Sequence, residues 1–413
     1  MLDYLTNADV IDVAEGRLLA GRTVHLEHGR VAAVTEERPR PGAGRILDLG
    51  GLTLIPGLID CHCHVMQSTT NLALLAAESP LYAAARAFEI MQGMLQRGFT
   101  TIRDAGGADF GIAKAVEEGR VPGPRIFYCG KALTATGGHG DYRSAGQYAQ
   151  DESYWVPRIS RLCEGGTALR AAVRDEVRKG AHHIKIMANG GVASPTDRIT
   201  SDQYSEEEIG AVVDEAEMAG LYVASHTYTA RSIARAVRCG VRSIEHGNLA
   251  DDETLALMKQ AGSFLVPTLV VFRALAEEGV GDGLPAELTG KLGDMFERGL
   301  GVVEKAHRLG IPMAFGSDLI GGMHRRQSEE FALRADVVPA ADLLRSATLG
   351  GARLLRRETE LGQVAPGFLA DLVAVDGNPL EDIRLLADPE RRFKLIVKGG
   401  AVVKNTLDGR CRG

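Results

Sequence analysis

Short apolar runs that end in polar or glycine residues recur along the middle of this chain, and each is followed by a segment with helical periodicity. Runs of this kind occupy residues 54–64, 100–104, 125–130, 183–188, 222–226, 243–246, 264–267 and 313–318. The segments between them, such as 206–219 and 251–261, begin with acidic residues and end close to a glycine, as helices often do. Eight β-α units over about 300 residues predict an α/β fold, a (β/α)8 TIM barrel over residues 55–359.

The two ends of the chain have a different pattern, in which strand-like segments alternate with turns and no helical segment intervenes. In the first fifty residues, strand patterns at 9–13, 23–27, 30–34 and 45–49 are separated by glycine- and proline-containing turns. The last fifty residues repeat this pattern at 371–375 and 394–403. We therefore expect one small β-sandwich domain made from residues 1–54 and 360–413 together.

Charge and hydropathy exclude several classes of partner. The net charge of −7 is modest, and no basic tract is present that would follow a phosphate backbone, so we expect no nucleic-acid partner. No apolar stretch approaches the roughly 18–20 residues that a membrane span needs, and the first residues lack the pattern of an export signal. The six cysteines are scattered, which is typical of reduced thiols. We expect a cytoplasmic protein without a membrane partner.

The segment from Gly57 to His64 carries two histidines at the end of the first predicted barrel strand. Because side chains alternate along a strand, His62 and His64 share one face, while Cys61 and Cys63 share the other. Two imidazoles on one face at the C-terminal end of a barrel strand can chelate one metal ion. The alternative is a pair of polar residues that fill the barrel interior, and both imidazoles would then need hydrogen-bond partners.

Four further predicted strands end in residue types that bind metals or bridge them. These residues are Lys185, His226, His246 and Asp318. Barrel enzymes carry their catalytic groups at the C-terminal ends of the strands. Ligand-type residues at five strand ends therefore predict a metal-dependent active site.

The strings at residues 56–62, 97–107, 136–141 and 184–195 resemble those of the amidohydrolase superfamily, within it the imidazolonepropionase-like branch of dipeptidases and carboxypeptidases. The resemblance covers nearly the whole chain and is strongest to bacterial zinc-dependent prolidases, which cleave dipeptides ending in proline. It implies two zinc ions, or other divalent metals, one held by His62, His64 and Asp318 and the second by His226 and His246.

The resemblance further implies that Lys185 bridges the two ions as N6-carboxylysine. A bare ammonium beside two dications would be repelled, whereas a carbamate supplies two anionic oxygens. The alternative for Lys185 is an ion pair with a carboxylate inside the barrel.

The resemblance also implies a reaction, in which a metal-bridging hydroxide attacks an amide carbonyl and Asp318 carries the proton to the leaving nitrogen. Tyr228 lies two residues after His226, so strand alternation points it to the same side. It resembles the family tyrosine that stabilises the oxyanion, and the alternative is an ordinary aromatic at the barrel top. His139, flanked by glycines, resembles a substrate contact, and the alternative is a solvated loop histidine.

We therefore expect a binuclear metal-dependent hydrolase that cleaves dipeptides, including Xaa-Pro, or N-acyl amino acids. Alternatives are an amidohydrolase that acts on ochratoxin A or on peptides with a C-terminal arginine or lysine, and a mononuclear deaminase or cyclic-amide hydrolase. A non-catalytic scaffold is disfavoured because all six ligand positions are filled. The resemblance also implies a homo-oligomer. Arg143 and His324 are open candidates for substrate contact, and His183 is expected to be a hydrogen-bonded core histidine.

Overall fold

The computed structural model describes residues 2–40, 42–150, 152–153, 156–194, 197–407 and 411–412. The chain divides into two compact units. Unit 1 comprises residues 1–60, 92–101 and 328–413, and unit 2 comprises residues 61–91 and 102–327. Among the described residues, no helix is both long and apolar enough to cross a membrane.

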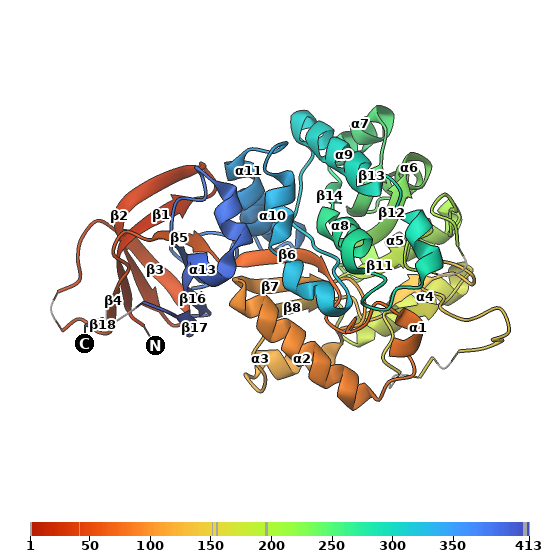
Figure 1. The fold of residues 1–413 in the computed structure, drawn as a ribbon, viewed down its shortest axis with the longest axis horizontal. Coiled ribbons are helices and arrows are strands. Elements are labelled where there is room, and N and C mark those ends of the chain that lie inside the picture. Colours follow the sequence, from red (N-terminus) through yellow and green to blue (C-terminus); the bar gives the residue numbers. More distant parts are fainter. Residues whose placement is uncertain are drawn as a thin grey trace. The chain divides into compact units, whose positions relative to one another are not determined.

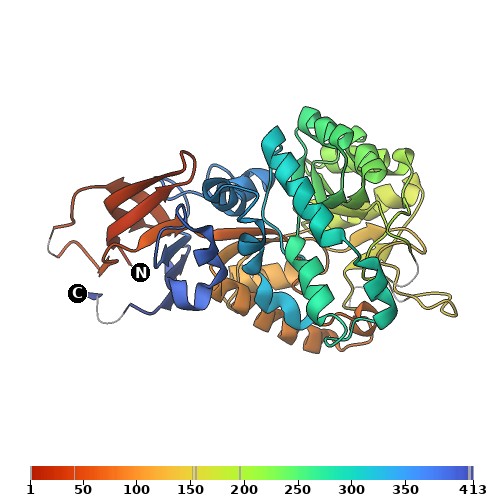
Figure 2. The same ribbon diagram turned by 45° about the horizontal axis from the view of Figure 1, so that its top comes forward.

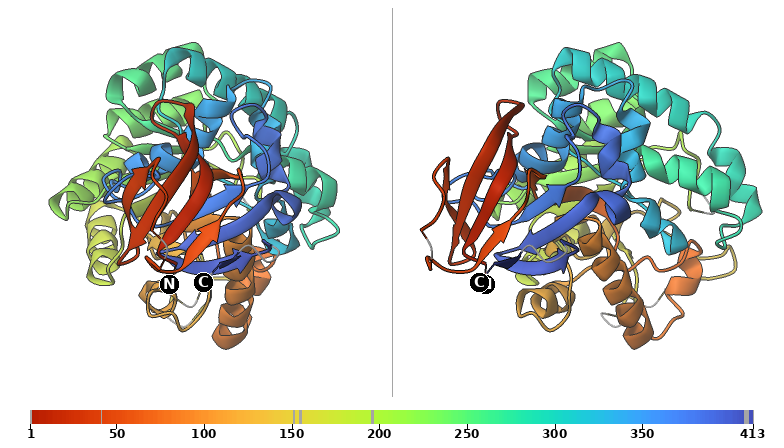
Figure 3. Two further views of the ribbon diagram at one scale, coloured as in Figure 1. Left: turned by 90° about the vertical axis from the view of Figure 1, so that its left-hand side faces the viewer. Right: turned by 60° about the vertical axis from the view of Figure 1, so that its left-hand side comes forward.

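Unit 1 contains a nine-stranded sheet to which both ends of the chain contribute. Seven strands follow the order β17-β16-β15-β5-β1-β2-β3, and β4 pairs with β1 and with β18. The left panel of Figure 3 shows the red and orange strands of the first residues beside the blue strands of the last ones. The strands are β1 (Tyr4–Asp12), β2 (Arg17–Glu27), β3 (Arg30–Thr35), β4 (Ile46–Asp48), β5 (Thr53–Pro56), β15 (Leu372–Val375), β16 (Phe393–Lys398), β17 (Ala401–Asn405) and β18 (Cys411–Arg412).

One apolar cluster stabilises this sheet, and its buried members come from both chain ends. Leu5, Val10 and Leu54 lie in the same cluster as Leu372 and Val397. Short helices complete unit 1, namely α10 (Glu329–Arg334), α11 (Ala340–Arg345), α12 (Gly351–Leu354) and α13 (Pro389–Arg392), with a π-helix at Ser346–Gly350 and a 3-10 helix at Ile383–Ala387. The strand patterns expected at the two ends of the chain are therefore present, and they belong to one sheet.

Unit 2 alternates strands with helices. A six-stranded parallel sheet has the order β10-β9-β11-β12-β13-β14, and a second sheet, in which the first three residues of β6 and of β7 belong to unit 1, has the order β6-β7-β8. Their strands are β6 (Leu58–Cys63), β7 (Phe99–Asp104), β8 (Arg125–Tyr128), β9 (Ala132–Thr134), β10 (Ser160–Leu162), β11 (Ile184–Met187), β12 (Val223–Thr229), β13 (Ser243–Leu249) and β14 (Phe264–Val266). The predicted α/β class with parallel strands is confirmed.

Helices follow most of these strands, and Figures 1 and 2 show the green helices packed along the outside of β11 to β14. The helices are α1 (Leu72–Leu75), α2 (Pro80–Gln96), α3 (Phe110–Glu117), α4 (Gly166–Arg178), α5 (Glu206–Met218), α6 (Ala230–Arg238), α7 (Asp252–Ala261), α8 (Leu269–Glu278) and α9 (Met295–Leu309), with 3-10 helices at Ala286–Lys291 and Gly321–Arg326. Helix α5 begins with a capping box, in which Ser205 and Glu208 satisfy each other's backbone N–H groups. Val212, Ile233 and Val302 bury the inner faces of these helices in one core.

The eighth predicted strand, at residues 313–318, is not a regular strand. Met313 forms a single parallel bridge with Leu265, and the Phe315 carbonyl accepts a hydrogen bond of 2.7 Å from the Cys61 N–H. Asp318 has a φ of 54°, which turns the backbone out of the extended conformation. The segment therefore hydrogen-bonds on both sides and ends in a turn that aims the Asp318 side chain.

Candidate active site

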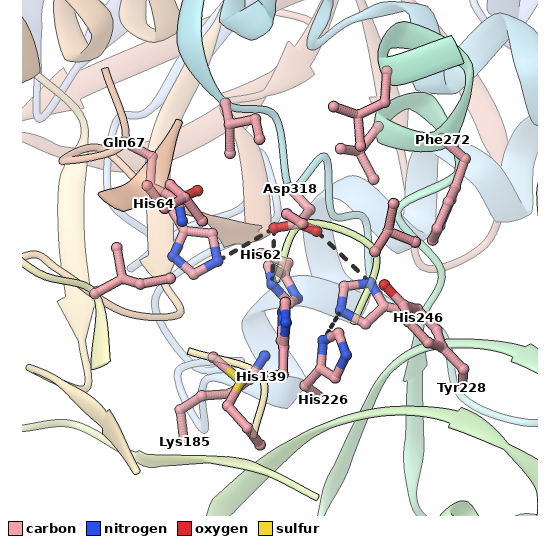
Figure 4. A pocket seen from close by; sticks show the side chains of 18 of the residues that line it. His62, His64, Gln67, His139, Lys185, His226, Tyr228, His246, Phe272 and Asp318 are labelled. Atoms are coloured by element: carbon pink, nitrogen blue, oxygen red, sulfur yellow. Dashed lines mark hydrogen bonds and ion pairs between the residues drawn. The ribbon is translucent and has the colours of Figure 1, made fainter. Parts of the chain in front are cut away.

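All eight residues predicted for the site line one pocket of unit 2 (Figure 4). They come from strands and from the segments that follow them, where α/β proteins carry their catalytic groups. His62 lies in β6, with His64 directly after it, Lys185 in β11, His226 and Tyr228 in β12, His246 in β13, Asp318 after the Met313 bridge, and His139 in the loop after β9.

Asp318 lies where three imidazoles converge, as the dashed lines in Figure 4 show. Its Oδ1 is 3.3 Å from His62 Nε2 and 3.2 Å from His64 Nε2, and its Oδ2 is 3.9 Å from His246 Nδ1. Burial alone would raise the pKa of Asp318, but the charge and hydrogen bond of His62 and the hydrogen bond of His64 hold it well below its ordinary value. One donor atom each from His62, His246 and Asp318 lie within 4.8 Å of one another. This group has the donor chemistry of a zinc site.

The rings of His62 and His64 are oriented by partners on their far nitrogens. His62 Nδ1 is 2.7 Å from Glu245 Oε2, and His64 Nδ1 is 2.8 Å from the Gly106 carbonyl oxygen. Each acceptor takes a hydrogen from Nδ1, so Nε2 is the nitrogen that faces Asp318 and the pocket. A ring that loses its Nε2 hydrogen and keeps the one on Nδ1 is the tautomer that a metal-binding histidine needs.

Glu245 is itself held by a buried ion pair that our sequence interpretation missed. Arg103 Nη2 lies 2.8 Å and 2.7 Å from the two Glu245 carboxylate oxygens, and both side chains are fully buried. The charges of Arg103 and His62 hold the pKa of Glu245 well below its ordinary value, although burial alone would raise it. A charged residue in the middle of each of two apolar strand patterns was the signal that could have revealed this pair.

The backbone at the site is unusual at three non-glycine positions. His246, Thr268 and Asp318 have φ values of 70°, 46° and 54°, in the left-handed region that side chains disfavour. Regular alternation would send Glu245 and His246 to opposite faces. The turn at His246 interrupts the alternation, so both side chains reach His62, whose ring centroid lies 4.9 Å from that of His246.

His226 and His246 form a second pair of imidazoles beside the first. His226 Nδ1 is 2.9 Å from His246 Nε2, and His246 Nδ1 is 2.7 Å from the Thr268 hydroxyl oxygen. Burial lowers the pKa of both histidines well below the ordinary value. Both rings are therefore neutral near pH 7, as metal ligands must be.

Lys185 is a buried lysine at the floor of the pocket, with 1% of its surface exposed. No hydrogen bond or ion pair joins its Nζ to another of the described residues. Burial lowers the pKa of Lys185, and the nearby charges of Glu245 and Asp318 oppose that effect. The ion-paired lysine considered as an alternative is therefore not found within the described part of the chain.

Tyr228 and His139 stand on the side of the pocket next to His226. The Tyr228 and His139 ring centroids lie 4.7 Å and 4.2 Å from that of His226, and His139 is stacked on it. Burial raises the pKa of Tyr228 well above its ordinary value, so its hydroxyl stays protonated and can donate a hydrogen bond. Burial lowers the pKa of His139 to about 4.

The remaining candidates lie away from the pocket. Arg143 makes a two-pronged ion pair with Asp141, at 2.8 Å and 2.7 Å, and does not line the pocket. His324 is buried, with Nε2 3.1 Å from the Gln67 carbonyl oxygen, and it positions that neighbouring segment. His183 is buried as expected, but the expected hydrogen bond is wrong, because neither ring nitrogen has a partner among the described residues. Its ring stacks on Tyr222 instead.

The pocket also has walls that the sequence did not reveal. Gln67, three residues after His64, lines it together with apolar side chains from several elements (Figure 4). The apolar members include Leu72, Ile159, Val271, Phe272, Leu275 and Ile320. Val271, Phe272 and Leu275 lie on α8, and the others reach the pocket from loops or from the start of α1, so no single pattern marks the whole set.

Comparison with known proteins agrees with this geometry. The sequence pattern of the amidohydrolase family matches residues 53–402. The chain belongs to the amidohydrolase family. A prolidase solved in complex with N-methylphosphonate-L-proline is 47% identical and superposes with a TM-score of 0.95, covering 98% of this chain and 99% of its own. Ochratoxinase from Aspergillus niger is 32% identical over 85% of this chain and 75% of its own. Imidazolonepropionase from Methylobacterium nodulans is 24% identical over 63% of this chain and 68% of its own.

These matches confirm the predicted family and branch. The family's members are hydrolases, so the chain is an enzyme that acts on carbon–nitrogen bonds. All eight predicted site residues lie within the matched range 53–402. One position of the recognised strings, Pro195, lies outside the described residues.

Proposed function

We propose that this enzyme is a binuclear metal-dependent dipeptidase that hydrolyses Xaa-Pro dipeptides. The observation that carries the proposal is the convergence of Asp318 on His62, His64 and His246 beside a buried lysine to which no carboxylate of the described residues is bonded. Such a set of donors suits divalent metal ions and has no obvious use in a purely structural core.

The residues fit two metal ions. His62, His64 and Asp318 would hold one ion, and His226 and His246 the second. Lys185 would bridge them as N6-carboxylysine. A buried ammonium without a bonded partner is costly, whereas carboxylation turns it into an anion suited to two cations. Zinc is the metal expected for this mixture of imidazole and carboxylate ligands.

The chain's own residues supply the remaining chemistry. The metal ions, when bound, would polarise the scissile carbonyl and lower the pKa of a water molecule. Asp318, held ionised by the histidines, would take the proton and deliver it to the leaving nitrogen. The protonated Tyr228 hydroxyl would donate a hydrogen bond to the oxyanion that forms at the carbonyl. His139, whose ring is stacked on that of His226, would contact the substrate.

The apolar wall of the pocket supports a small apolar substrate. Asp318 is the one carboxylate among the described residues that line it, so a C-terminal arginine or lysine would find no counter-charge there. The prolidase neighbour favours proline on the leaving side. A second candidate, favoured by the relative named ochratoxinase and by Phe272 and Leu275 in the wall, is an N-acyl aromatic amino acid such as ochratoxin A.

The finer features of the fold are proposals too. We infer that the two sheets of unit 2 are arcs of one closed (β/α)8 barrel. Hydrogen bonds support this closure, from His182 N to the Tyr128 carbonyl (2.8 Å) and from Cys61 N to the Phe315 carbonyl (2.7 Å). The β-sandwich of residues 1–54 and 360–413, the barrel limits at 55 and 359, the homo-oligomer and the cytoplasmic location stay predictions.

Hydrolysis by the zinc-loaded enzyme tests the function. Xaa-Pro dipeptides, other dipeptides and N-acyl amino acids should be offered in parallel, with release of the free amino acid as the readout. The proposal predicts the highest kcat/KM for an Xaa-Pro dipeptide. Exclusive turnover of N-acyl aromatic amino acids would favour the second candidate, and turnover of neither class would contradict both.

A further inference from the structure

The side chain of Lys291 is bonded to the loop after β11, whose described residues are 188–194 and 197–202. Its ammonium donates to the carbonyl oxygens of Gly191, Ser194 and Asp197, at 3.0, 2.7 and 2.7 Å. Asp197 Oδ1 lies 3.4 Å from the same nitrogen. Lys291 is the last residue of the 3-10 helix Ala286–Lys291, so it joins this loop to a segment 94 to 100 positions further along the chain.

The loop after β11 forms part of the pocket wall. Val192 and Ala193 line the pocket, and neither is a proposed metal ligand. Val192 is buried, and Ala193 packs against the apolar cluster that contains Leu72 and Ile159, which line the pocket as well. These two loop residues therefore belong to the apolar surface that a substrate would meet.

Lys291 holds the backbone on both sides of these two wall residues. Gly191 directly precedes Val192, Ser194 directly follows Ala193, and the carbonyls of Gly191 and Ser194 are two of the three that Lys291 binds. Both residues are buried. A buried carbonyl that loses its donor is costly, so the ammonium stabilises this conformation of the loop.

Counting hydrogens separates this role from direct recognition of a substrate. An ammonium group has three hydrogens, and three carbonyl oxygens lie at 2.7–3.0 Å from it. The Asp197 carboxylate supplies a negative charge beside them. Lys291 therefore has no hydrogen left for a substrate carboxylate, and it does not line the pocket.

We propose that Lys291 is a positioning residue for substrate binding, which holds Val192 and Ala193 in place as the wall against which the substrate packs. This inference rests on the proposed function and extends it to a residue outside the pocket. The wall lies against parts of the substrate that do not react, so it stabilises the bound substrate and the transition state to the same extent. Lys291 should therefore determine KM and leave kcat almost unchanged.

Kinetics of Lys291→Met test this division. The substitution keeps an unbranched side chain and removes the ammonium. KM for an Xaa-Pro dipeptide should rise about 10- to 100-fold, which corresponds to loss of the burial of one apolar side chain, with little change in kcat. The zinc content should stay that of wild type. A loss confined to kcat, or a lowered zinc content, would contradict the assignment.

Lys305→Met is the matched control. Lys305 donates to one carboxylate oxygen of Asp252, at 2.6 Å, and does not line the pocket. This variant loses a lysine of unit 2 with one anionic partner and no carbonyl cage. Its KM should equal that of wild type, and a rise as large as that of Lys291→Met would contradict a specific role for Lys291.

Chemical rescue tests whether the hydrogen bonds of the ammonium matter. Lys291→Ala leaves space for ethylammonium, which carries three N–H hydrogens, whereas tetramethylammonium carries the same charge and none. Ethylammonium chloride should lower the raised KM of Lys291→Ala, tetramethylammonium chloride at equal ionic strength should not, and neither should change KM of wild type. Equal rescue by both salts, or rescue by neither, would contradict the proposal.

Hydrogen exchange of the zinc-loaded enzyme tests the positioning without turnover. The Gly190 and Gly191 N–H groups are bonded to the Ser201 carbonyl and to Asp197 Oδ2. Both should exchange faster in Lys291→Met, while helix α7 keeps its wild-type rates. Unchanged exchange at Gly190 and Gly191 would overturn the inference. Faster exchange in an enzyme that hydrolyses no offered substrate would contradict the proposed function alone.

Discussion

The contacts of the buried ion pair between Glu245 and Arg103 predict how much folding stability and zinc affinity a substitution of Glu245 should cost. Glu245 Oε2 is 2.7 Å from both His62 Nδ1 and Arg103 Nη2, and Oε1 is 2.8 Å from Arg103 Nη2 and 2.5 Å from the Ser243 hydroxyl. In Glu245→Gln, an NH2 group must replace one of these oxygens. At the Oε2 position it loses the contacts with His62 and Arg103, and at the Oε1 position it loses the contact with Arg103, while the Ser243 hydroxyl can turn to accept from it. The negative charge that supports His62 as a ligand is lost as well.

Two effects should appear in Glu245→Gln. Uncoupling one partner of a fully buried pair costs about 3–5 kcal/mol of folding free energy. Loss of the partner that orients a metal-binding histidine weakens metal binding by about 10- to 100-fold, which is about 1.4–2.7 kcal/mol. Competition of the metal-free enzyme with a chelator of known zinc affinity measures the second effect, and thermal unfolding measures the first.

Glu330→Gln provides the control for this experiment. Glu330 and Arg334 are also fully buried, with Arg334 Nε 3.2 Å from Glu330 Oε1, but they lie in unit 1 and do not line the pocket. This variant should lose stability and keep its zinc affinity. If Glu245→Gln also keeps wild-type zinc affinity, the reasoning that links Glu245 through His62 to the metal is refuted.

Three other substitutions test separate parts of the account. Asp318→Asn should lower kcat by at least about 100-fold without changing the circular dichroism spectrum, because the proton carrier is lost; near-normal turnover would refute the role of Asp318. Tyr228→Phe keeps the ring beside His226 but removes the donor, so kcat should fall by about 100- to 1000-fold while KM changes little; an unchanged kcat would leave the hydroxyl without a role. The pKa of Glu208, which burial alone would raise, is lowered by the N–H groups of Ser205 and Gly165. A carboxyl whose pKa is lower in the folded state stabilises the fold above its unfolded pKa of about 4.3, and this stabilisation is lost as pH falls. Between about pH 6 and pH 3, the melting temperature of metal-free Glu208→Gln should therefore fall by less than that of metal-free wild type. An equal fall would contradict the capping role.

Much of the fold and of the candidate site could be predicted from the periodic spacing of apolar and polar residues in strands and helices. Alternation along β6 placed His62 and His64 on one face, and the structure has both rings in contact with Asp318. The same rule placed Tyr228 beside His226. Strand ends are predictable in this way because the period of two links sequence position to direction.

What the sequence did not reveal depends on irregular backbone and on contacts distant in sequence. The left-handed turn at His246 brings Glu245 into the site, and alternation would have excluded it. Segment 313–318 was expected as a strand, but the positive φ of Asp318 ends it in a turn. The Ser194 hydroxyl contacts both His139 Nδ1 and Asp197 Oδ1 and so joins two loops. No periodic pattern specifies the conformations of these loops.

The number of metal ions per subunit tests the central claim most directly. Elemental analysis of zinc-loaded enzyme, with protein concentration from amino-acid analysis, should give two zinc ions per chain, and Lys185→Met should give fewer. One tightly bound ion in wild type, unchanged in Lys185→Met, would contradict a two-metal centre bridged by Lys185.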